Sequence, residues 1–197
     1  MMPDRNFHLM QLDSNSAAST GIIIRPMALD DLAQVVAIDQ MSFSLPWPAH
    51  SFRYEVLDNE VSRQWVAEMQ YAGPDTNLAR TQADPDRKTS EVVGMIVVWL
   101  ILDEAHIATI AVHPQYRRFG IGRKLLLTAL HECVAQGAST ATLEVRERNL
   151  IAIDMYRMFG FEVVGRRKRY YNDTNEDAIL MTLDTKGLNS LIARIGG

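Results

Sequence analysis

The sequence predicts a mixed α/β fold in one domain, and three observations lead to it. Short segments rich in Val and Ile recur along the chain, as is typical of strands. Between them lie segments whose apolar residues are spaced by three or four positions, the period of an amphipathic helix. The 197 residues, 47% of them hydrophobic, are enough to close one core. We therefore expect one domain at 21–184, a flexible leader at 1–20 and a weakly anchored tail at 185–197.

The first half of the chain is predicted to hold four strands and two helices. A first strand is expected at Gly21–Pro26, where the proline ends it. Helical spacing runs from Leu29 to Ile38. The two prolines of Ser44–Pro48 require a turn, after which we expect a short helix at Ala49–Leu57. Further strands are expected at Val61–Gln70, Glu91–Leu102 and His106–Val112, the last two paired antiparallel and the first two separated by a polar loop insertion at 71–90.

The second half begins with a long helix from Gly120 to Gly137. Its apolar residues fall on one face, while charged residues occupy the other. Strand and helix signals then alternate again, which completes the mixed pattern. The apolar face comprises Ile121, Leu125, Leu126, Ala129, Leu130 and Cys133. We expect strands at Ala141–Val145, Phe161–Gly165 and Asp177–Leu183, and a helix at Asn149–Phe159.

Composition excludes several classes of protein. A net charge of -4 argues against a broad basic face that coats nucleic acid. Cys133 is the single cysteine, so there is no internal disulfide and no thiolate metal cluster; on its apolar helix face it is expected to be a buried small hydrophobe. His106 and His113 lack neighbouring ligands at metal spacing, so no metal site is expected. Residues 1–20 lack an apolar signal region, and Val92–Leu102 is too short to span a bilayer, so we expect a cytoplasmic protein without a membrane anchor.

A glycine-containing turn is the first candidate for a binding site. It follows the strand His106–Val112 and opens the helix at Gly120, where unpaired N–H groups and the helix dipole attract anions. Gly120 and Gly122 allow close approach of a phosphate to the backbone. Spacing alone favours a plain strand-to-helix turn without a ligand. Charged donors around this turn are Arg117, Arg118 and Arg123.

The pattern Arg117-x-x-Gly120-x-Gly122 resembles the Gln/Arg-x-x-Gly-x-Gly/Ala signature of the GNAT acetyltransferases. The resemblance extends over roughly Ile22–Leu183, and its finer features resemble the RimI-like branch, which acetylates protein N-termini, notably the alanine of a ribosomal protein. Further stretches carry it: Leu45-Pro46-Trp47 with Phe52, Leu102-Asp103-Glu104-Ala105, Leu143-Glu144-Val145-Arg146 with Asn149, Tyr156-x-x-Phe159-Gly160-Phe161, and Tyr170-Tyr171 with Glu176-Asp177-Ala178.

This resemblance implies a GNAT domain at 21–184. Its fold is a central mixed sheet of six to seven strands with helices on both faces, in which the fourth and fifth strands splay apart to hold acetyl-CoA. The cosubstrate would lie against backbone groups at the end of the fourth strand, with its pyrophosphate in the turn. The implied cofactor-binding residues are Ile110, Ala111 and Val112, then Arg117, Arg118, Phe119, Gly120, Ile121, Gly122 and Arg123, and Asn149 on the opposite lip.

Two residues are candidates for the chemistry. An α-amine has a pKa near 8, so at pH 7 only about a tenth is unprotonated and a base helps. Glu144, near the end of a strand beside the slot, is placed to take the proton; the alternative is a surface glutamate. Tyr156, two turns along the helix from Asn149, takes in this family the role of acid toward the departing thiolate. Its alternative is a place in the apolar stripe of that helix.

The acceptor side rests on the resemblance as well. Leu45 and Trp47, and Tyr170 and Tyr171, resemble the two loops that flank the acceptor peptide in N-terminal acetyltransferases. Packing in the core is the alternative for the aromatic rings. For Arg166–Arg169 we expect a solvated patch and no direct contact with nucleic acid. Acetylation of lysine or of a small-molecule amine stays open, as does an acetyl-CoA-binding module without turnover.

Overall fold

The computed structural model describes residues 21–71 and 89–195; the predicted leader and most of the predicted 71–90 insertion fall outside them. At its centre is a seven-stranded sheet in the order β1-β2-β3-β4-β5-β7-β6. Only β4 and β5 pair in parallel, so the predicted mixed sheet is confirmed. The strands are β1 (Gly21–Pro26), β2 (Ser62–Gln70), β3 (Ser90–Ile101), β4 (Glu104–Val112), β5 (Thr140–Arg146), β6 (Glu162–Tyr171) and β7 (Glu176–Leu183).

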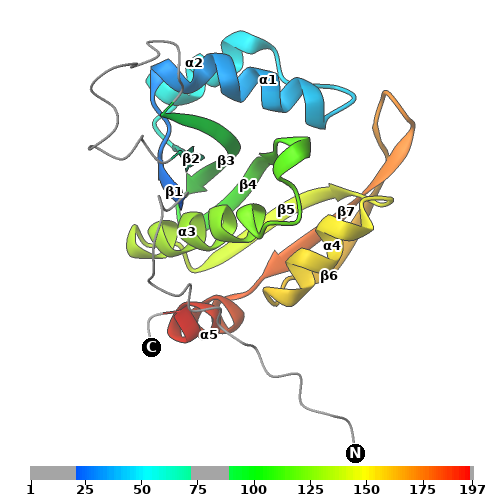
Figure 1. Ribbon diagram of the computed structural model, residues 1–197. Helices are drawn as coiled ribbons and strands as arrows, with labels where there is room; N and C mark the ends of the chain where they lie inside the picture. The colour runs from blue at the N-terminus through cyan, green and yellow to red at the C-terminus, as the bar shows by residue number, and fades with distance from the viewer. Residues whose placement is uncertain (1–20, 72–88, 196–197) are drawn as a thin grey trace, which may run out of the picture.

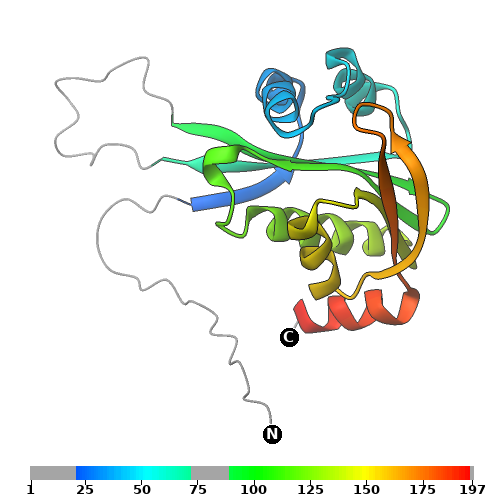
Figure 2. The same ribbon diagram turned by 90° about the vertical axis from the view of Figure 1, so that its right-hand side faces the viewer.

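Helices cover both faces of this sheet, as expected. Figures 1 and 2 show α1 and α2 above one face and α3, α4 and α5 below the other. The α3 face predicted to be apolar is buried throughout, and Gly137 ends the helix with a φ of 104°. The helices are α1 (Leu32–Ser42), α2 (Ala49–Leu57), α3 (Ile121–Ala135), α4 (Leu150–Met158) and α5 (Thr185–Ile195), with 3-10 turns at Leu29–Asp31 and Pro114–Tyr116.

Each face of the sheet has its own hydrophobic core. The core under α3, α4 and α5 contains Cys133, and burial raises the pKa of its thiol to about 11. Cys133 is therefore a poor nucleophile, as the sequence predicted. The core under α1 and α2 is smaller and is centred on Val35, Ile38 and Phe52. Since the sheet separates the two cores, groups that approach from opposite faces can meet only where the sheet opens.

The sheet opens between β4 and β5. Parallel pairing joins only 104–107 of β4 to 140–143 of β5, and beyond these pairs the strands part. A β-bulge marks the same place, because the register with β3 goes from Ile107 to Thr109 and skips Ala108. The bulge exchanges the faces of β4: Ala105 and Ile107 lie in the α3-side core, whereas Ala111 lies in the α1-side core. The predicted splay of the fourth and fifth strands is confirmed.

Two predictions about the C-terminal part were wrong. Residues 185–191 of the predicted tail are not weakly anchored, because Leu188 and Leu191 of α5 are buried in the α3-side core. Gly187 packs so closely that a Cβ there would lie 2.6 Å from a side-chain carbon of Leu183. The strand expected to end at Gly165 continues to Tyr171, because it pairs with β7 as far as Arg167 and again, after a register shift, at Tyr171. Tyr170 and Tyr171 therefore lie at the end of a strand and not in a loop.

Candidate functional site

The turn between β4 and α3 has the backbone of an anion site. His113 caps the 3-10 turn by accepting a hydrogen bond at Nδ1 from the Gln115 N–H (3.3 Å). Arg118 and Gly120 then adopt left-handed conformations, with φ of 69° and 77°. Gly120 is the N-cap of α3, and no side chain caps the first turn of that helix. Its first N–H groups are thus open to an anionic ligand.

Among the residues predicted to bind the phosphate, some side chains contact other parts of the protein and others are exposed. Arg117 is turned back onto the protein, because Nε donates to the Val112 carbonyl (3.0 Å) and Nη2 to Ser42 Oγ (3.1 Å). Arg123 lies over the Phe159 ring, 5.8 Å from its centroid. Ile121 is a core residue, so only its backbone can reach a ligand, whereas Phe119 is exposed. A Cβ on Gly122 would come no closer than 3.7 Å to the protein.

Residues predicted on the two lips of the slot lie where the strands part. Ile110, Ala111 and Val112 are the part of β4 beyond its pairing with β5. They still pair with β3, so their other edge faces the opening. Across it, Asn149 is the N-cap of α4 and accepts a hydrogen bond from the Ala152 N–H (3.3 Å). The slot therefore has a strand on one side and a helix start on the other.

Glu144 is held in the β5 half of this opening. Its side chain is 16% exposed, and each carboxylate oxygen has a basic partner: Oε2 lies 3.4 Å from His106 Nε2, and Oε1 lies 3.3 Å from Arg167 Nη1. A solvated surface glutamate is thereby excluded. Sequence reasoning considered His106 only as a metal ligand and missed this contact. The parallel register that pairs His106 with Thr142, two residues before Glu144, brings the two side chains together.

Tyr156 approaches from the opposite face. It is 4% exposed, belongs to the α3-side core and packs edge-to-face on Phe161, with ring centroids 5.7 Å apart. Burial, together with the nearby Tyr171 phenol, raises the pKa of Tyr156 above its usual range. Burial also raises the pKa of Tyr171 to about 12, and its phenol interacts electrostatically with Glu144. Tyr171 thus interacts electrostatically with both predicted catalytic residues.

The α1–α2 loop and the β6–β7 hairpin are tied together beside the opening. The Ser44 hydroxyl donates a hydrogen bond to Asp173, and Arg146 Nη2 lies 2.8 Å from Asp173 Oδ2. The Arg146 guanidinium also lies over the Tyr171 ring, 3.9 Å from its centroid. Sequence reasoning did not single out Ser44 or Asp173, because a hydrogen bond across 129 residues leaves no local pattern.

The α1–α2 loop contains both packed and open residues. The Trp47 ring stacks on Phe52 at 5.3 Å and on Trp99 at 6.3 Å, so its packing role is real. Its backbone N–H donates to Asp39 Oδ2 (2.7 Å), and burial raises the pKa of that aspartate. Leu45 and Tyr170 are exposed and are available to a ligand. Trp47 thus positions the loop by its packing, whereas Leu45 is exposed on it.

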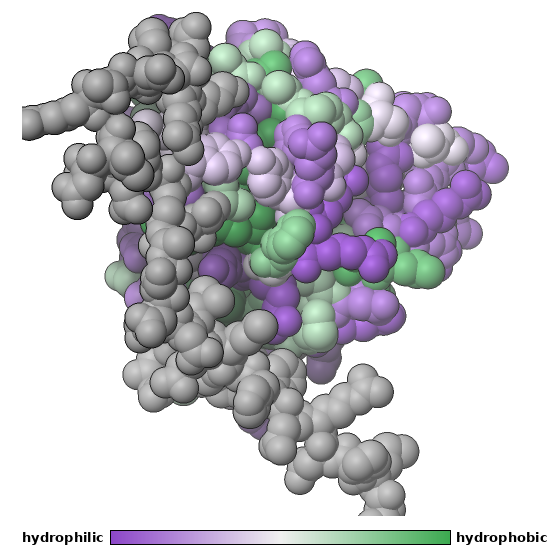
Figure 3. Space-filling view, in the orientation of Figure 1, coloured by the Kyte–Doolittle hydropathy of each residue, from purple (hydrophilic) through white to green (hydrophobic). Residues whose placement is uncertain are grey.

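The surface of the hairpin is hydrophilic. In Figure 3 the hydrophilic residues gather over the part of the molecule where β6, β7 and α4 lie in Figure 1. Within the predicted basic patch, Arg166 contacts Glu147 (2.6 Å) and Asp177 (3.2 Å). Acidic neighbours therefore offset part of the positive charge on this edge strand.

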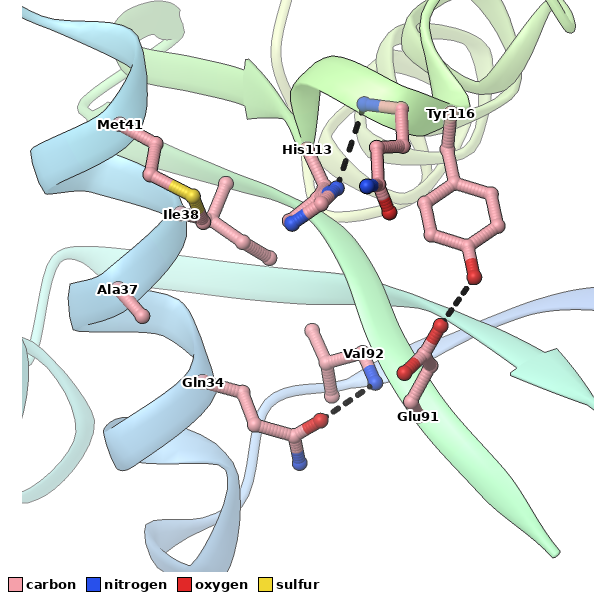
Figure 4. Close-up of a pocket in the computed structure, with 9 residues that line it drawn as sticks. Gln34, Ala37, Ile38, Met41, Glu91, Val92, His113 and Tyr116 are labelled. Carbon is pink, nitrogen blue, oxygen red and sulfur yellow. Dashed lines mark hydrogen bonds between the residues drawn. The ribbon is translucent and has the colours of Figure 1, made fainter. Parts of the chain in front are cut away.

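A separate cavity of about 200 Å³ opens between α1, β3 and the turn before α3. In Figure 4 the Gln34 side-chain oxygen accepts a hydrogen bond from the Val92 N–H, and the Tyr116 hydroxyl donates a hydrogen bond to Glu91. Neither Glu144 nor Tyr156 lines this cavity. Among residues 21–71 and 89–195 there is no cluster of three metal-ligating side chains. In the same residues no helix is long and apolar enough to cross a membrane.

Comparison with known proteins gives one consistent result. The profile of the Acetyltransferase (GNAT) family matches residues 32–161. A Bacillus subtilis (strain 168) protein with the provisional name [ribosomal protein bS18]-alanine N-acetyltransferase is 33% identical over 162 residues, 82% of this chain and 95% of its own. The crystal structure of the ribosomal-protein-S18-alanine N-acetyltransferase from Escherichia coli superposes with a TM-score of 0.67 at 29% identity, over 84% of this chain and 94% of that one. Arabidopsis thaliana NAA60 in complex with acetyl-CoA shares the fold, with a TM-score of 0.70 at 20% identity over 84% and 99% of the two chains.

Proposed function

The chain belongs to the acetyltransferase (GNAT) family, and on this basis we propose that it transfers the acetyl group of acetyl-CoA to the N-terminal α-amine of a protein, ribosomal protein bS18 being the preferred acceptor. One observation carries the proposal: the sheet opens between β4 and β5 where Glu144 and Tyr156 arrive from opposite faces. A carboxylate and a neutral phenol on the two sides of one slot suit acetyl transfer to an amine.

The turn and the open part of β4 hold the cosubstrate in this proposal. The uncapped first turn of α3 binds the pyrophosphate through its N–H groups. Gly122 has no Cβ and so lets the phosphate approach the backbone closely; a Cβ there would lie 3.7 Å from the side chains of Met155 and Val112. Backbone groups of 110–112 that do not pair with β5 bind the pantetheine amides and the acetyl carbonyl, except the Val112 carbonyl, which already accepts a hydrogen bond from Arg117. Asn149 closes the slot from the start of α4.

The reaction then proceeds by direct attack. An ammonium group gives one proton to Glu144, and the neutral amine attacks the acetyl carbonyl. Collapse of the tetrahedral species breaks the C–S bond, and the thiolate takes a proton from the Tyr156 hydroxyl. The nitrogen then loses a second proton, which goes to the Tyr156 phenolate. The balance is one amide, one CoA thiol and one proton released. Tyr156 suits the role of acid because its raised pKa keeps the phenol protonated until the thiolate forms.

The two tied segments form the acceptor side. Leu45 and Tyr170 offer exposed apolar surface for the first residues of a peptide. Asp173 and Glu176 lie near the same opening through their contacts with Arg146, and they favour a substrate that carries a cationic N-terminus. The named acceptor of the relatives, the N-terminal alanine of bS18, has a small side chain that fits a narrow entrance between two linked segments.

Peptide acetylation tests the proposal. The protein is incubated with acetyl-CoA and a peptide that copies the alanine-initiated N-terminus of bS18, and then with the same peptide blocked at its α-amine but carrying an internal lysine. We expect mass spectrometry to find one acetyl group on the free peptide and none on the blocked one. Preference for the blocked peptide would assign the activity to lysine instead. A control peptide with N-terminal leucine measures how strongly the small first residue is selected.

A further inference from the structure

A continuous row of polar contacts leads from Glu144 to the protein surface along the paired part of β4 and β5. Glu144 Oε2 lies 3.4 Å from His106 Nε2. On the other side of the ring, His106 Nδ1 is 3.1 Å from Thr142 Oγ1. The Thr142 hydroxyl in turn donates to Glu104 Oε1 at 2.8 Å. Exposure rises from 16% for the Glu144 side chain to 24% for His106, and Glu104 is exposed.

The direction of each hydrogen bond follows from the groups present. An ionised carboxylate only accepts, so the single Thr142 hydroxyl proton points at Glu104. Thr142 Oγ1 is then left as an acceptor toward His106, and Nδ1 must carry a proton. With Nδ1 protonated, Nε2 is the nitrogen that gains or loses a proton. Its contact with Glu144 is attractive only when a proton lies between the two atoms.

The surroundings of His106 hold the ring in this orientation. Trp99 stacks on the imidazole with ring centroids 5.6 Å apart, and the Trp99 N–H donates to Glu55 (3.0 Å), which fixes the indole. The charged groups that reach the imidazole are Glu144 directly, Glu104 through Thr142, and Arg167 through its contact with Glu144. Glu144 therefore lies at Nε2 of the ring, and Glu104 lies beyond Thr142 on the Nδ1 side. Arg167 contacts Glu144 and not the ring.

We propose that His106, Thr142 and Glu104 form a relay that removes from Glu144 the proton released in each turnover. This rests on the proposed function, in which Glu144 accepts a proton from the amine. The Glu144 carboxyl passes its proton to Nε2, and the imidazolium gives its Nδ1 proton to Thr142 Oγ1. The Thr142 hydroxyl proton moves to Glu104, which releases it to water. Exchange with solvent at the partly exposed ring then restores the Nδ1–H form.

Four variants separate the relay from a structural network. His106→Gln keeps a donor near Glu144 but cannot carry a proton, and Thr142→Val keeps the shape without the hydroxyl. Thr142→Ser is the matched control because it restores the hydroxyl. We expect His106→Gln and Thr142→Val to lower kcat about tenfold or more, with KM for acetyl-CoA unchanged, and Thr142→Ser to retain activity. Glu104→Gln should lower kcat less, since water can take the proton from Thr142.

Added imidazole supplies the decisive readout. As a small diffusible base it should restore part of kcat in His106→Gln and Thr142→Val, in proportion to its concentration, but not in the wild type. A loss of kcat that imidazole leaves unchanged would show that the network is only structural and would overturn the relay. The same holds if Thr142→Val has wild-type kcat.

Nitrogen NMR of His106 tests the relay without any acceptor. We expect Nδ1 to stay protonated across the titration while Nε2 gains and loses the proton, and this order to disappear in Thr142→Val. The His106→Gln spectrum assigns the resonances. Titration at Nδ1 in the wild type would overturn the relay even if the peptide assay succeeds. If no peptide is acetylated by the wild type, the proposed function fails while this measurement still stands.

Discussion

At the scale of single residues, the site depends on two side chains with opposite electrostatic surroundings. Glu144 is partly exposed, and its two carboxylate oxygens contact two basic groups, His106 and Arg167. Tyr156 is fully enclosed by apolar neighbours, which favour its neutral form. In the proposed mechanism, the base and the acid therefore lie on opposite faces of one sheet before any substrate binds.

Replacing Glu144 by Gln removes the base and little else. We expect kcat to fall by about 10² to 10⁴, with unchanged affinity for acetyl-CoA in calorimetry, because the cosubstrate does not need the carboxylate. Glu147→Gln is the matched control: it lies three residues further on, contacts Arg166 and should keep wild-type kcat. Equal activity of the Glu144 variant and the wild type would remove Glu144 from the mechanism.

The burial of Tyr156 also predicts a dependence of stability on pH. Its pKa is raised in the folded protein, so above about pH 10 the unfolded chain loses this proton first. The raised value contributes stability below the unfolded pKa, and this is lost as the pH rises toward the folded pKa. Relative to Tyr156→Phe, the wild type should therefore lose about 1.4 kcal/mol per pH unit above about pH 10, measured by urea unfolding. Phe161→Leu, which lacks a titrating group, should instead differ from the wild type by the same amount at each pH.

Resemblance to a family predicted Glu144, Tyr156 and the phosphate turn, but not the partners of these residues. Motifs report residues close in sequence, such as Arg117 and Gly122. The contact of His106 with Glu144 depends on the parallel register of two strands whose paired residues lie 36 positions apart in the sequence, and Ser44 meets Asp173 across 129 residues. Neither relation has a local pattern that periodicity could reveal.

At the scale of elements, the bounds of Gly21–Pro26 and Ala49–Leu57 were predicted to the residue, because prolines mark both places. The length of β6 was not predicted. Its run Arg166–Arg169 shows no alternation of apolar and polar residues, since an edge strand with two solvated faces has no buried side to encode. Helix α5 was not predicted, although Leu188, Leu191, Ile192 and Ile195 have the spacing of an amphipathic helix.

Helix α5 should contribute measurably to stability. Leu188→Ala removes a side chain that is 1% exposed and should lower the free energy of unfolding by about 2 to 5 kcal/mol. Asn189→Ala, an exposed neighbour on the same helix, should change it by less than about 0.5 kcal/mol. Urea denaturation of both variants checks this. If Leu188→Ala changes the free energy of unfolding as little as Asn189→Ala, then α5 does not contribute to the stability of the domain.

At the scale of the whole molecule, the sheet consists of two parts that meet through only four residue pairs. One part is β1 to β4, the other is β5, β7 and β6. Acetyl-CoA, in the proposed pose, occupies the gap where the pairing stops and contacts both parts. Binding should therefore act on the stability of the whole domain and not on one loop.

Acetyl-CoA at one hundred times its Kd should raise the free energy of unfolding by about 2.7 kcal/mol, because it binds only the folded chain. Thermal unfolding with and without the cosubstrate measures this. Hydrogen exchange should show which residues the cosubstrate protects. We expect slower exchange in 110–112 of β4 and in the first turn of α3, which hold the cosubstrate in the proposed pose. Slowing confined to the cavity beside α1 would place the cosubstrate elsewhere.

The bulge at Ala108 has a consequence for how this site can be inherited or engineered. The slot depends on one extra residue in β4 relative to β3. It therefore depends on the length of the strand and not on the chemistry of any one side chain. Point substitutions can weaken the slot, but they cannot shift the phase of the strand. Deleting one residue at Ala108 would restore an even ladder and turn 109–112 over, and every later side chain of β4 would then face the wrong core. Descendants of this chain can change their acceptor by substitution, while an insertion or deletion in this strand abolishes the slot in one step.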